Sequence, residues 1–177
     1  MLQIISGTFA RRVLQQPPAA ITRPVSEKVR GAIFNSLAAD LDGARVLDLF
    51  AGSGALGLEA LSRGAAKVDF VEKNNKVVSV LKQNIAILGV REVAKVHVGS
   101  VERFFEQANE AYDVVFMDPP YADFEQGMVE QAVGLLQYGG TLIVSTSSKA
   151  NLVAPSGTEL NRQKTYGDTM ITVLKKV

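Results

Sequence analysis

Between residues 44 and 145 the chain alternates short apolar runs with longer stretches in which apolar residues recur every three to four positions. Short apolar runs predict buried strands, and the longer spacing predicts helices that bury one face. The predicted strands are residues 46–50, 67–72, 94–98, 112–117 and 141–145. The predicted helices are residues 55–63, 77–88, 101–107 and 124–137. This alternation is typical of a parallel sheet covered on both faces.

The end of the chain has a different pattern. Residues 160–164 and 170–175 are two further strand-like runs, and the short turn Tyr166-Gly167-Asp168 lies between them. Two runs joined in this way predict an antiparallel hairpin. The whole pattern therefore predicts a doubly wound α/β fold, with a seven-stranded and mostly parallel sheet that ends in an antiparallel pair. A ligand of such a fold is expected above the carboxyl ends of the central strands.

The start of the chain precedes this alternation. Two short extended runs within residues 2–15 flank Ser6-Gly7-Thr8, which predicts a small hairpin. Ser26 is a favourable helix N-cap, and apolar residues follow it at four-residue spacing. We therefore predict an amphipathic helix over residues 26–39.

Length and composition narrow the class of protein. The 177 residues, 47% hydrophobic and 21% charged, fit one folded domain over residues 1–177, with a hairpin and helix appendage at 1–40 and a Rossmann-like core at 41–177. No cysteine is present, which excludes disulfides and thiolate metal sites, and we expect no metal. The sequence has no signal-peptide pattern and no apolar run of membrane-spanning length. We expect a cytoplasmic protein with no membrane partner.

The net charge of +1 hides an uneven distribution of charge. Residues 1–35 carry five basic side chains against one acidic side chain, a net +4. The other 142 residues carry 14 basic and 17 acidic side chains, a net −3. A basic arm before a slightly acidic core suggests a polyanionic partner, although for so few charges a solvated surface is the better explanation on this evidence alone.

A glycine-rich segment lies where nucleotide-like cofactors bind. Gly52-Ser53-Gly54-Ala55-Leu56-Gly57 follows a predicted strand and opens a predicted helix, so its backbone can turn tightly and present amide groups to a ligand. Glu72 ends the next strand, 20 residues after Gly52, where a carboxylate can accept hydrogen bonds from ribose hydroxyls. NAD and S-adenosylmethionine would both fit. The predicted cofactor contacts are Asp48, Phe50, Ala51, Gly52, Ser53, Gly54, Gly57 and Glu72.

Asp48 helps to separate these two cofactors. It lies four residues before Gly52, inside the predicted strand. A carboxylate there could orient the loop and attract the methionine ammonium group, whereas it would repel a pyrophosphate. A dehydrogenase would also need a proton-transfer residue, and the single histidine, His97, lies in an apolar run typical of a half-buried strand. The pattern favours S-adenosylmethionine, and a NAD-binding module remains an alternative.

The predicted strand 112–117 ends at Asp118-Pro119-Pro120-Tyr121, which we predict to be the catalytic segment. The two prolines stiffen the turn and remove two backbone donors. An exocyclic base amine is a poor nucleophile, because its lone pair is delocalised into the ring. Asp118 and the Pro119 carbonyl could accept its two hydrogens, and Tyr121 could stack on a base turned out of its helix. Alignment with the methyl sulfonium then supplies most of the acceleration.

Other segments extend the pattern over nearly the whole chain. They are Ile5-Ser6-Gly7, Arg11-Arg12, Thr22-Arg23-Pro24, Val29-Arg30, Phe34-Asn35, 46–57, 61–65, 70–72, 118–121 and Tyr166-Gly167-Asp168-Thr169. Together they resemble the RsmD type of 16S ribosomal RNA guanine-N2 methyltransferases. The glycine loop and D-P-P-Y occur in many amino-methyltransferases, whereas the amino-terminal segments and S-R-G-A are more restricted to this family. The resemblance implies a Rossmann-like class I methyltransferase fold.

The resemblance also implies a reaction and a substrate. The implied reaction is S-adenosylmethionine-dependent N2-methylation of guanine 966 in 16S ribosomal RNA. The implied substrate is the small ribosomal subunit or an assembly intermediate of it. We expect a monomer whose RNA contacts are Arg11, Arg12, Arg23 and Arg30. Two departures from the family pattern are Ser100 before Val101, where an acid usually holds the adenine amine, and Ser145, where a glutamate is usual. Ser100 and Val101 remain predicted cofactor contacts.

Two alternatives stay open at this point. An amino-methyltransferase that acts on adenine N6 or cytosine N4 of another RNA or a DNA would share every predicted catalytic residue. A DNA-modifying enzyme would normally need a target-recognition domain, for which 177 residues leave no room. A NAD-binding module is the third possibility, and it depends on whether the D-P-P-Y segment borders the cofactor loop.

Overall fold

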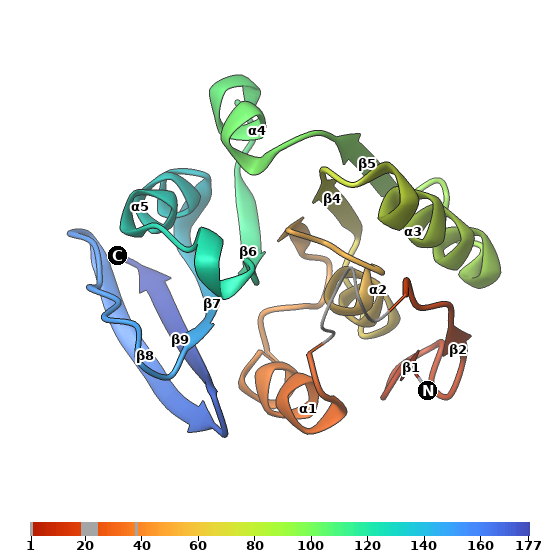
Figure 1. Cartoon of the computed structure of the whole chain (residues 1–177), viewed down its shortest axis with the longest axis horizontal. Helices are drawn as coiled ribbons and strands as arrows, with labels where there is room; N and C mark the ends of the chain where they lie inside the picture. Colours follow the sequence, from red (N-terminus) through yellow and green to blue (C-terminus); the bar gives the residue numbers. More distant parts are fainter. Residues whose placement is uncertain (1, 19–24, 38) are drawn as a thin grey trace.

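The computed structural model describes residues 2–18, 25–37 and 39–177. Seven strands form one sheet in the order β5-β4-β3-β6-β7-β9-β8 (Figure 1). The strands are β3 (Arg45–Leu49), β4 (Lys67–Glu72), β5 (Ala94–Val98), β6 (Tyr112–Met117), β7 (Leu136–Ser147), β8 (Thr158–Tyr166) and β9 (Thr169–Lys176). The first five pair in parallel, and β9 is antiparallel to both β7 and β8. The predicted mostly parallel sheet with an antiparallel end is confirmed.

Helices cover both faces of this sheet. Helices α1 (Glu27–Ser36), α2 (Ala55–Ser62) and α3 (Asn75–Leu88) contribute to one hydrophobic cluster, and α4 (Val101–Gln107) and α5 (Gln126–Gly134) contribute to the other. Side chains alternate along each strand, so Val46 of β3 joins the first cluster and Leu47 joins the second. On this alternation, Asp48 faces the same side as Val46, toward α2.

The predicted helix bounds were mostly close, and α5 is the exception. The prediction of a helix over 124–137 was wrong at both ends, because α5 covers only Gln126–Gly134 and β7 already begins at Leu136. Gly139, with a φ of +76°, and Gly140 lie inside β7, at a shift in its register with β6. A Cβ on Gly140 would lie 2.9 Å from the Gln137 carbonyl oxygen, so this irregularity requires glycine.

Helix α1 begins as predicted and belongs to the main core. The Ser26 hydroxyl accepts a hydrogen bond from the Val29 N–H at 3.3 Å. The helix ends at Ser36 and not at residue 39. Phe34 is fully buried, and its ring centroid lies 5.6 Å from that of Phe116 on β6. Packing on the central sheet therefore fixes this helix beside the core.

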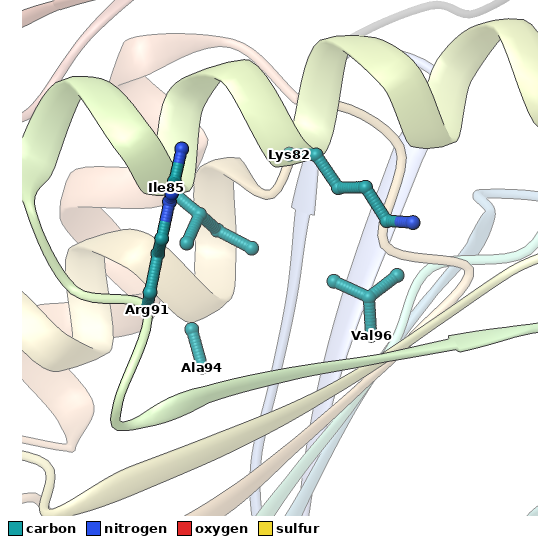
Figure 2. Close-up of a pocket in the computed structure, with 5 residues that line it drawn as sticks. All are labelled: Lys82, Ile85, Arg91, Ala94 and Val96. Carbon is teal, nitrogen blue, oxygen red and sulfur yellow. The ribbon is translucent and has the colours of Figure 1, made fainter.

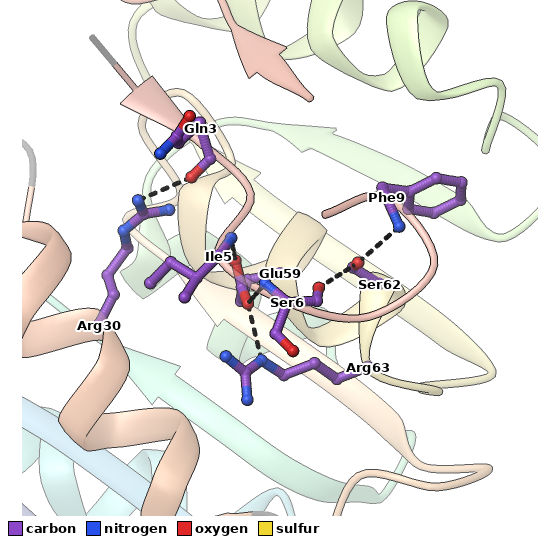
Figure 3. A network of polar contacts seen from close by, with 8 residues as sticks. All are labelled: Gln3, Ile5, Ser6, Phe9, Arg30, Glu59, Ser62 and Arg63. Carbon is purple, nitrogen blue, oxygen red and sulfur yellow. Dashed lines mark hydrogen bonds and ion pairs between the residues drawn. The ribbon is translucent and has the colours of Figure 1, made fainter. Parts of the chain in front are cut away.

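A buried carboxylate attaches the amino-terminal hairpin, β1 (Leu2–Gln3) and β2 (Val13–Leu14), to α2. Glu59 is fully buried, and its carboxylate accepts the N–H groups of Ile5 at 2.7 Å and Ser6 at 3.0 Å (Figure 3). The Arg63 guanidinium donates to the same carboxylate at 2.7 Å. A buried charge needs this set of partners to offset its lost hydration.

The neighbouring Ser62 makes a second attachment. Its hydroxyl accepts the Phe9 N–H at 2.9 Å and donates to the Ser6 carbonyl oxygen (Figure 3). A Cβ on Gly7 would lie 1.8 Å from the Ser62 carbonyl oxygen, and Gly7 has a φ of +86°. Only glycine can therefore occupy this point of the predicted hairpin turn.

Asn84 on α3 makes the third attachment, which sequence reasoning missed. Its side chain is fully buried and exchanges hydrogen bonds with Gln15, accepting the N–H at 2.7 Å and donating to the carbonyl at 3.0 Å. It also donates to the Ser53 carbonyl oxygen at 2.9 Å. One amide thus holds the amino-terminal segment and the glycine loop together. A lone asparagine on the apolar face of a predicted helix was the available signal.

The buried Glu59 site predicts a specific loss of stability. Replacing Glu59 by Ala leaves two N–H groups and nearby guanidinium charge without their carboxylate, so the free energy of unfolding should fall by about 3–5 kcal/mol. Urea unfolding followed by circular dichroism measures it. Glu130 lies exposed on α5, and Glu130→Ala should change stability by less than about 0.5 kcal/mol. Equal effects of the two variants would contradict the role given to Glu59.

Candidate functional site

The glycine loop connects β3 to α2 through left-handed backbone. Phe50 has a φ of +61°, Gly52 of +56° and Gly54 of +83°, and Gly54 is the N-cap of α2. A positive φ strains residues other than glycine, so Phe50 stores strain beside the loop. The loop places the first amides of α2 above the carboxyl end of β3, where the sequence predicted cofactor contacts.

Two of the predicted contact glycines are explained by packing. A Cβ on Gly54 would lie 2.4 Å from Leu81 of α3, and a Cβ on Gly57 would lie 2.3 Å from the Phe70 ring on β4. Gly57 also donates its N–H to Asp48 at 2.9 Å. Gly57 thus packs α2 against the sheet, and its N–H is already bonded to Asp48. This position does not fit a direct contact between Gly57 and the cofactor.

Asp48 fixes the loop from beneath. Its side chain is 1% exposed and accepts the Gly57 N–H across the β3–α2 connection. Burial raises the pKa of Asp48 well above its ordinary value, the Gly57 hydrogen bond lowers it, and the charges of Asp118 and Glu72 raise it further. The predicted role of this residue in orienting the loop agrees with its geometry.

Glu72 stands on the other side of the loop, at the carboxyl end of β4. One carboxylate oxygen accepts the Gly52 N–H at 3.0 Å, and the other accepts the Asn74 N–H at 2.8 Å. Each oxygen retains further lone-pair capacity. Glu72 therefore anchors the loop and can still accept hydroxyl hydrogens, as its predicted ribose contact requires.

Asp118 follows β6 directly and completes a group of three acids. Burial raises the pKa of Asp118 to about 6, and a hydrogen bond from the Ser145 hydroxyl opposes that rise. Ser145 is 1% exposed and lies on β7, next to β6 in the sheet. The departure noted at position 145 thus supplies a donor to the predicted catalytic acid.

The rest of the D-P-P-Y segment passes from the buried core to the surface. Pro119 is buried and Pro120 is exposed. Tyr121 begins a short 3-10 helix, Tyr121–Asp123, and 42% of its surface is exposed. Its hydroxyl forms a hydrogen bond of 2.5 Å with the Thr169 hydroxyl on β9. The ring is therefore accessible and tethered at its outer end.

Asp48, Glu72 and Asp118 come together because β4, β3 and β6 are neighbours whose parallel strands end at one edge. The charges of Asp118 and Glu72 both raise the pKa of Asp48, so the three carboxyl groups share one electrostatic environment. Such an environment favours a cationic ligand and opposes a pyrophosphate. The D-P-P-Y segment borders the cofactor loop, as the methyltransferase interpretation requires.

Ser100 and Val101 lie at the start of α4, next to the end of β5. The Ser100 hydroxyl accepts the Arg103 N–H at 3.3 Å as a helix N-cap, and Val101 is buried. Their position at the carboxyl edge of the sheet agrees with the predicted contact. The N-cap hydrogen bond accounts for Ser100 without a cofactor.

The four predicted RNA-binding arginines separate into different environments. Arg11 and Arg12 are exposed, and Arg12 donates to the Ile87 carbonyl oxygen at 3.2 Å. Arg30 is 1% exposed and donates to the Gln3 carbonyl oxygen at 2.9 Å (Figure 3). The prediction of a phosphate contact at Arg30 was wrong, because its guanidinium lies in the core, where burial lowers its pKa. Arg23 lies outside the described residues.

Two hollows in the surface lie away from Asp48, Glu72 and Asp118. One, of about 330 Å³, is lined by Lys82 and Ile85 of α3 and by Arg91, Ala94 and Val96 on the β5 side (Figure 2). The other, of about 730 Å³, adjoins the first residues of β3, β4 and β5. The strand beginnings are at the edge of the sheet opposite to Asp48, Glu72 and Asp118, so the larger hollow is separate from the candidate site.

Two features are absent from the part of the chain that the structure describes. No helix within residues 2–18, 25–37 and 39–177 is long and apolar enough to cross a membrane. Over the same ranges, no group of three or more histidine, aspartate or glutamate side chains is arranged to hold a metal ion.

The chain is similar to several known proteins. The profile of a family described as Conserved hypothetical protein 95 matches residues 2–175. Ribosomal RNA small subunit methyltransferase D of Escherichia coli K12 is 35% identical, over 94% of this chain and 85% of the relative. The protein of the same name from Haemophilus influenzae is 33% identical, over 94% and 89%. The structure of Escherichia coli yhhF superposes with a TM-score of 0.89 at 30% identity, covering 99% and 97% of the two chains.

The fold and these motifs define a class I S-adenosylmethionine-dependent methyltransferase. The motifs are the glycine loop after β3, the acid at the end of β4 and the D-P-P-Y segment after β6. The chain belongs to the family described as Conserved hypothetical protein 95, the RsmD-type methyltransferases.

The Ser145 contact gives a prediction about ionisation. Ser145→Ala removes the donor that favours the Asp118 carboxylate, so the pKa of Asp118 should rise above the wild-type value of about 6. Carbon NMR of labelled aspartate carboxyl groups, titrated over pH, measures the shift. Ser147→Ala, two residues along the same strand, is the matched control and should leave this titration unchanged. A Ser145→Ala titration identical to wild type would contradict the contact.

Proposed function

We propose that this protein transfers a methyl group from S-adenosylmethionine to the N2 amine of a guanine in 16S ribosomal RNA, at the position corresponding to guanine 966. The observation that carries the proposal is that Asp48, Glu72 and Asp118 lie at the carboxyl edge of three neighbouring parallel strands, where Glu72 and Asp48 hydrogen-bond to Gly52 and Gly57 of the glycine segment. The named functions of the similar proteins from Escherichia coli and Haemophilus influenzae support a ribosomal RNA substrate.

The residues around the glycine loop fit S-adenosylmethionine. Glu72 can accept the ribose hydroxyls, the amides near Gly52 and Ser53 can meet the polar part of the cofactor, and the charge around Asp48 favours its ammonium and sulfonium groups. Ser100 and Val101 can border the adenine. The bound cofactor supplies an electrophilic methyl group. NAD fits poorly, because its pyrophosphate would lie beside the Glu72 and Asp118 carboxylates.

Asp118 and Pro119 act on the target amine. The Asp118 carboxylate and the Pro119 carbonyl accept the two amine hydrogens, which frees the nitrogen lone pair toward the methyl carbon. Bound S-adenosylmethionine would supply the methyl group to this nitrogen and would leave as a neutral thioether. The alkylated nitrogen then releases a proton to Asp118 or to water. A pKa of about 6 leaves Asp118 mostly ionised at neutral pH.

Tyr121 and the amino-terminal arginines recognise the RNA in this proposal. The exposed Tyr121 ring can stack on the target base, and Pro120 stiffens the turn that carries it. Exposed Arg11 and Arg12 can contact phosphates beside the target. Arg11 and Arg12 would thus contact the RNA, and the loops at the carboxyl edge of the sheet would carry the chemistry. Adenine N6 would satisfy the same catalytic groups, and the family relationship favours guanine.

The decisive experiment follows labelled methyl transfer to purified small ribosomal subunits, with nucleoside analysis of the digested RNA. The expected product is N2-methylguanosine. Asp118→Ala should lower single-turnover transfer by orders of magnitude, because its carboxylate acts in the transition state, and cofactor affinity should be nearly unchanged. Asp123→Ala is the matched control, since Asp123 is exposed in the same loop and pairs with Lys73 at 3.4 Å.

Three outcomes would contradict parts of this proposal. N6-methyladenosine as the sole product would overturn the guanine assignment and leave the amine chemistry intact. Near-normal transfer by Asp118→Ala would remove the role of that carboxylate. Calorimetry that detects tight binding of NAD and none of S-adenosylhomocysteine would favour the NAD-binding alternative.

The exposed arginines predict a dependence on salt. If Arg11 and Arg12 neutralise phosphates, Arg11→Gln and Arg12→Gln should each lower the slope of log affinity for RNA against log salt by about 0.7–0.9. Cofactor affinity should stay constant. Arg162→Gln, on the exposed edge strand β8, is the charge-matched control and should leave the slope unchanged. Slopes identical to wild type in both arginine variants would place the RNA elsewhere.

A further inference from the structure

Tyr121 and Thr169 are 48 residues apart in the sequence, and their hydroxyl groups lie 2.5 Å apart. Either hydroxyl can be the donor of this hydrogen bond. It joins the D-P-P-Y segment to the terminal β8–β9 hairpin. The role of Thr169 did not emerge from the sequence, where Tyr166-Gly167-Asp168-Thr169 served only as a family signature.

The sheet brings Thr169 to the catalytic edge. Strand β9 runs antiparallel to β7, with Thr169 opposite Ser147, so β9 begins where β7 ends. Because β7 is parallel to β6, that point lies near the carboxyl end of β6, from which the D-P-P-Y segment departs. An additional parallel strand at this position would begin at the opposite edge. The reversed direction of β9 is therefore what places the Thr169 hydroxyl here.

The turn that carries Thr169 is itself held. Gly167 has a φ of +59°, as a tight turn between β8 and β9 requires. The Ser148 N–H donates to the Asp168 carbonyl oxygen at 2.8 Å, which joins the turn to the end of β7. A threonine on a turn fixed at both sides is a rigid point of attachment.

Tyr121 has little else to fix its ring. Its 3-10 helix contains no buried residue, and 42% of the tyrosine surface is exposed. Such a side chain would exchange between rotamers on its own, and ordering it on contact with a base would cost conformational entropy. The hydroxyl bond to Thr169 removes that freedom in advance.

We propose that Thr169 is a positioning residue whose hydroxyl orients the Tyr121 ring for stacking on the target base. The inference rests on the proposed function, because it assigns Tyr121 to that base. Its chemical requirement is a hydroxyl at position 169 paired with a hydroxyl at position 121. The terminal hairpin then contributes to substrate recognition as well as closing the sheet.

A double-mutant cycle tests the pairing. Thr169→Val keeps the branched shape and removes the hydroxyl, and Tyr121→Phe keeps the ring and removes the hydroxyl. Each should lower single-turnover methylation of small subunits about threefold to tenfold, the scale of one hydrogen bond. The double variant should be no slower than either single variant, because both changes remove the same interaction.

Two further variants separate positioning from general structure. Thr169→Ser retains a hydroxyl and should restore most of the wild-type rate. Thr165→Val makes the same change at an exposed position on β8 and should have no effect. All variants should keep the wild-type cofactor affinity and unfolding midpoint. Wild-type rates for Thr169→Val, or multiplicative losses in the double variant, would overturn the proposal.

A measurement without methyl transfer separates this inference from the proposed function. The chain has four tyrosines, so fluorotyrosine NMR should give four resonances, with that of Tyr121 assigned by its loss in Tyr121→Phe. Thr169→Val should shift the Tyr121 resonance toward that of a solvent-averaged ring, and Thr169→Ser should not. An unmoved resonance would overturn the positioning role even if the enzyme methylates guanine. If Thr169→Val shifts the Tyr121 resonance but the wild-type protein transfers no methyl group, the Tyr121–Thr169 hydrogen bond is supported and the proposed function is rejected.

Discussion

The hydrogen bond from the Gly57 N–H to the buried Asp48 carboxylate connects the central strand to the helix that follows the glycine loop. Strand β3 has β4 on one side and β6 on the other, so fixing the loop above β3 also fixes it between Glu72 and Asp118. Burial and neighbouring acids disfavour the charge on Asp48, and the glycine N–H offsets part of that cost. The Glu72 and Asp118 carboxylates on either side of the loop would favour a cationic ligand there.

The antiparallel end of the sheet is part of this site. Parallel strands bring their carboxyl ends to one edge, β8 also ends at that edge, and the reversed strand β9 begins there. Ser145 and the turn before Thr169 consequently reach the D-P-P-Y segment from a part of the chain that follows it. The strand arrangement thus couples the last third of the sequence to the catalytic loop.

Buried polar groups connect the amino-terminal segment to the same loop. Glu59 and Ser62 hold the hairpin on α2, and Asn84 joins Gln15 to Ser53. The arginines near the amino terminus lie in two different environments. Arg12 remains on the surface, whereas Arg30 packs into the core. Counting charges along a sequence cannot separate these two cases, because exposure depends on the partners that the fold supplies.

The sequence by itself determined the sheet, most element bounds and the segments proposed to form the site, because hydrophobic periodicity, glycine turns and the D-P-P-Y motif act within a few residues of each other. It could not determine the end of α5, since the Gly139-Gly140 irregularity depends on pairing with β6. Only tertiary structure decided that Arg30 is buried, that Gly57 packs on Phe70 and that Thr169 meets Tyr121. These contacts join residues distant in sequence, and their partners are selected by strand order and packing, which no local pattern encodes.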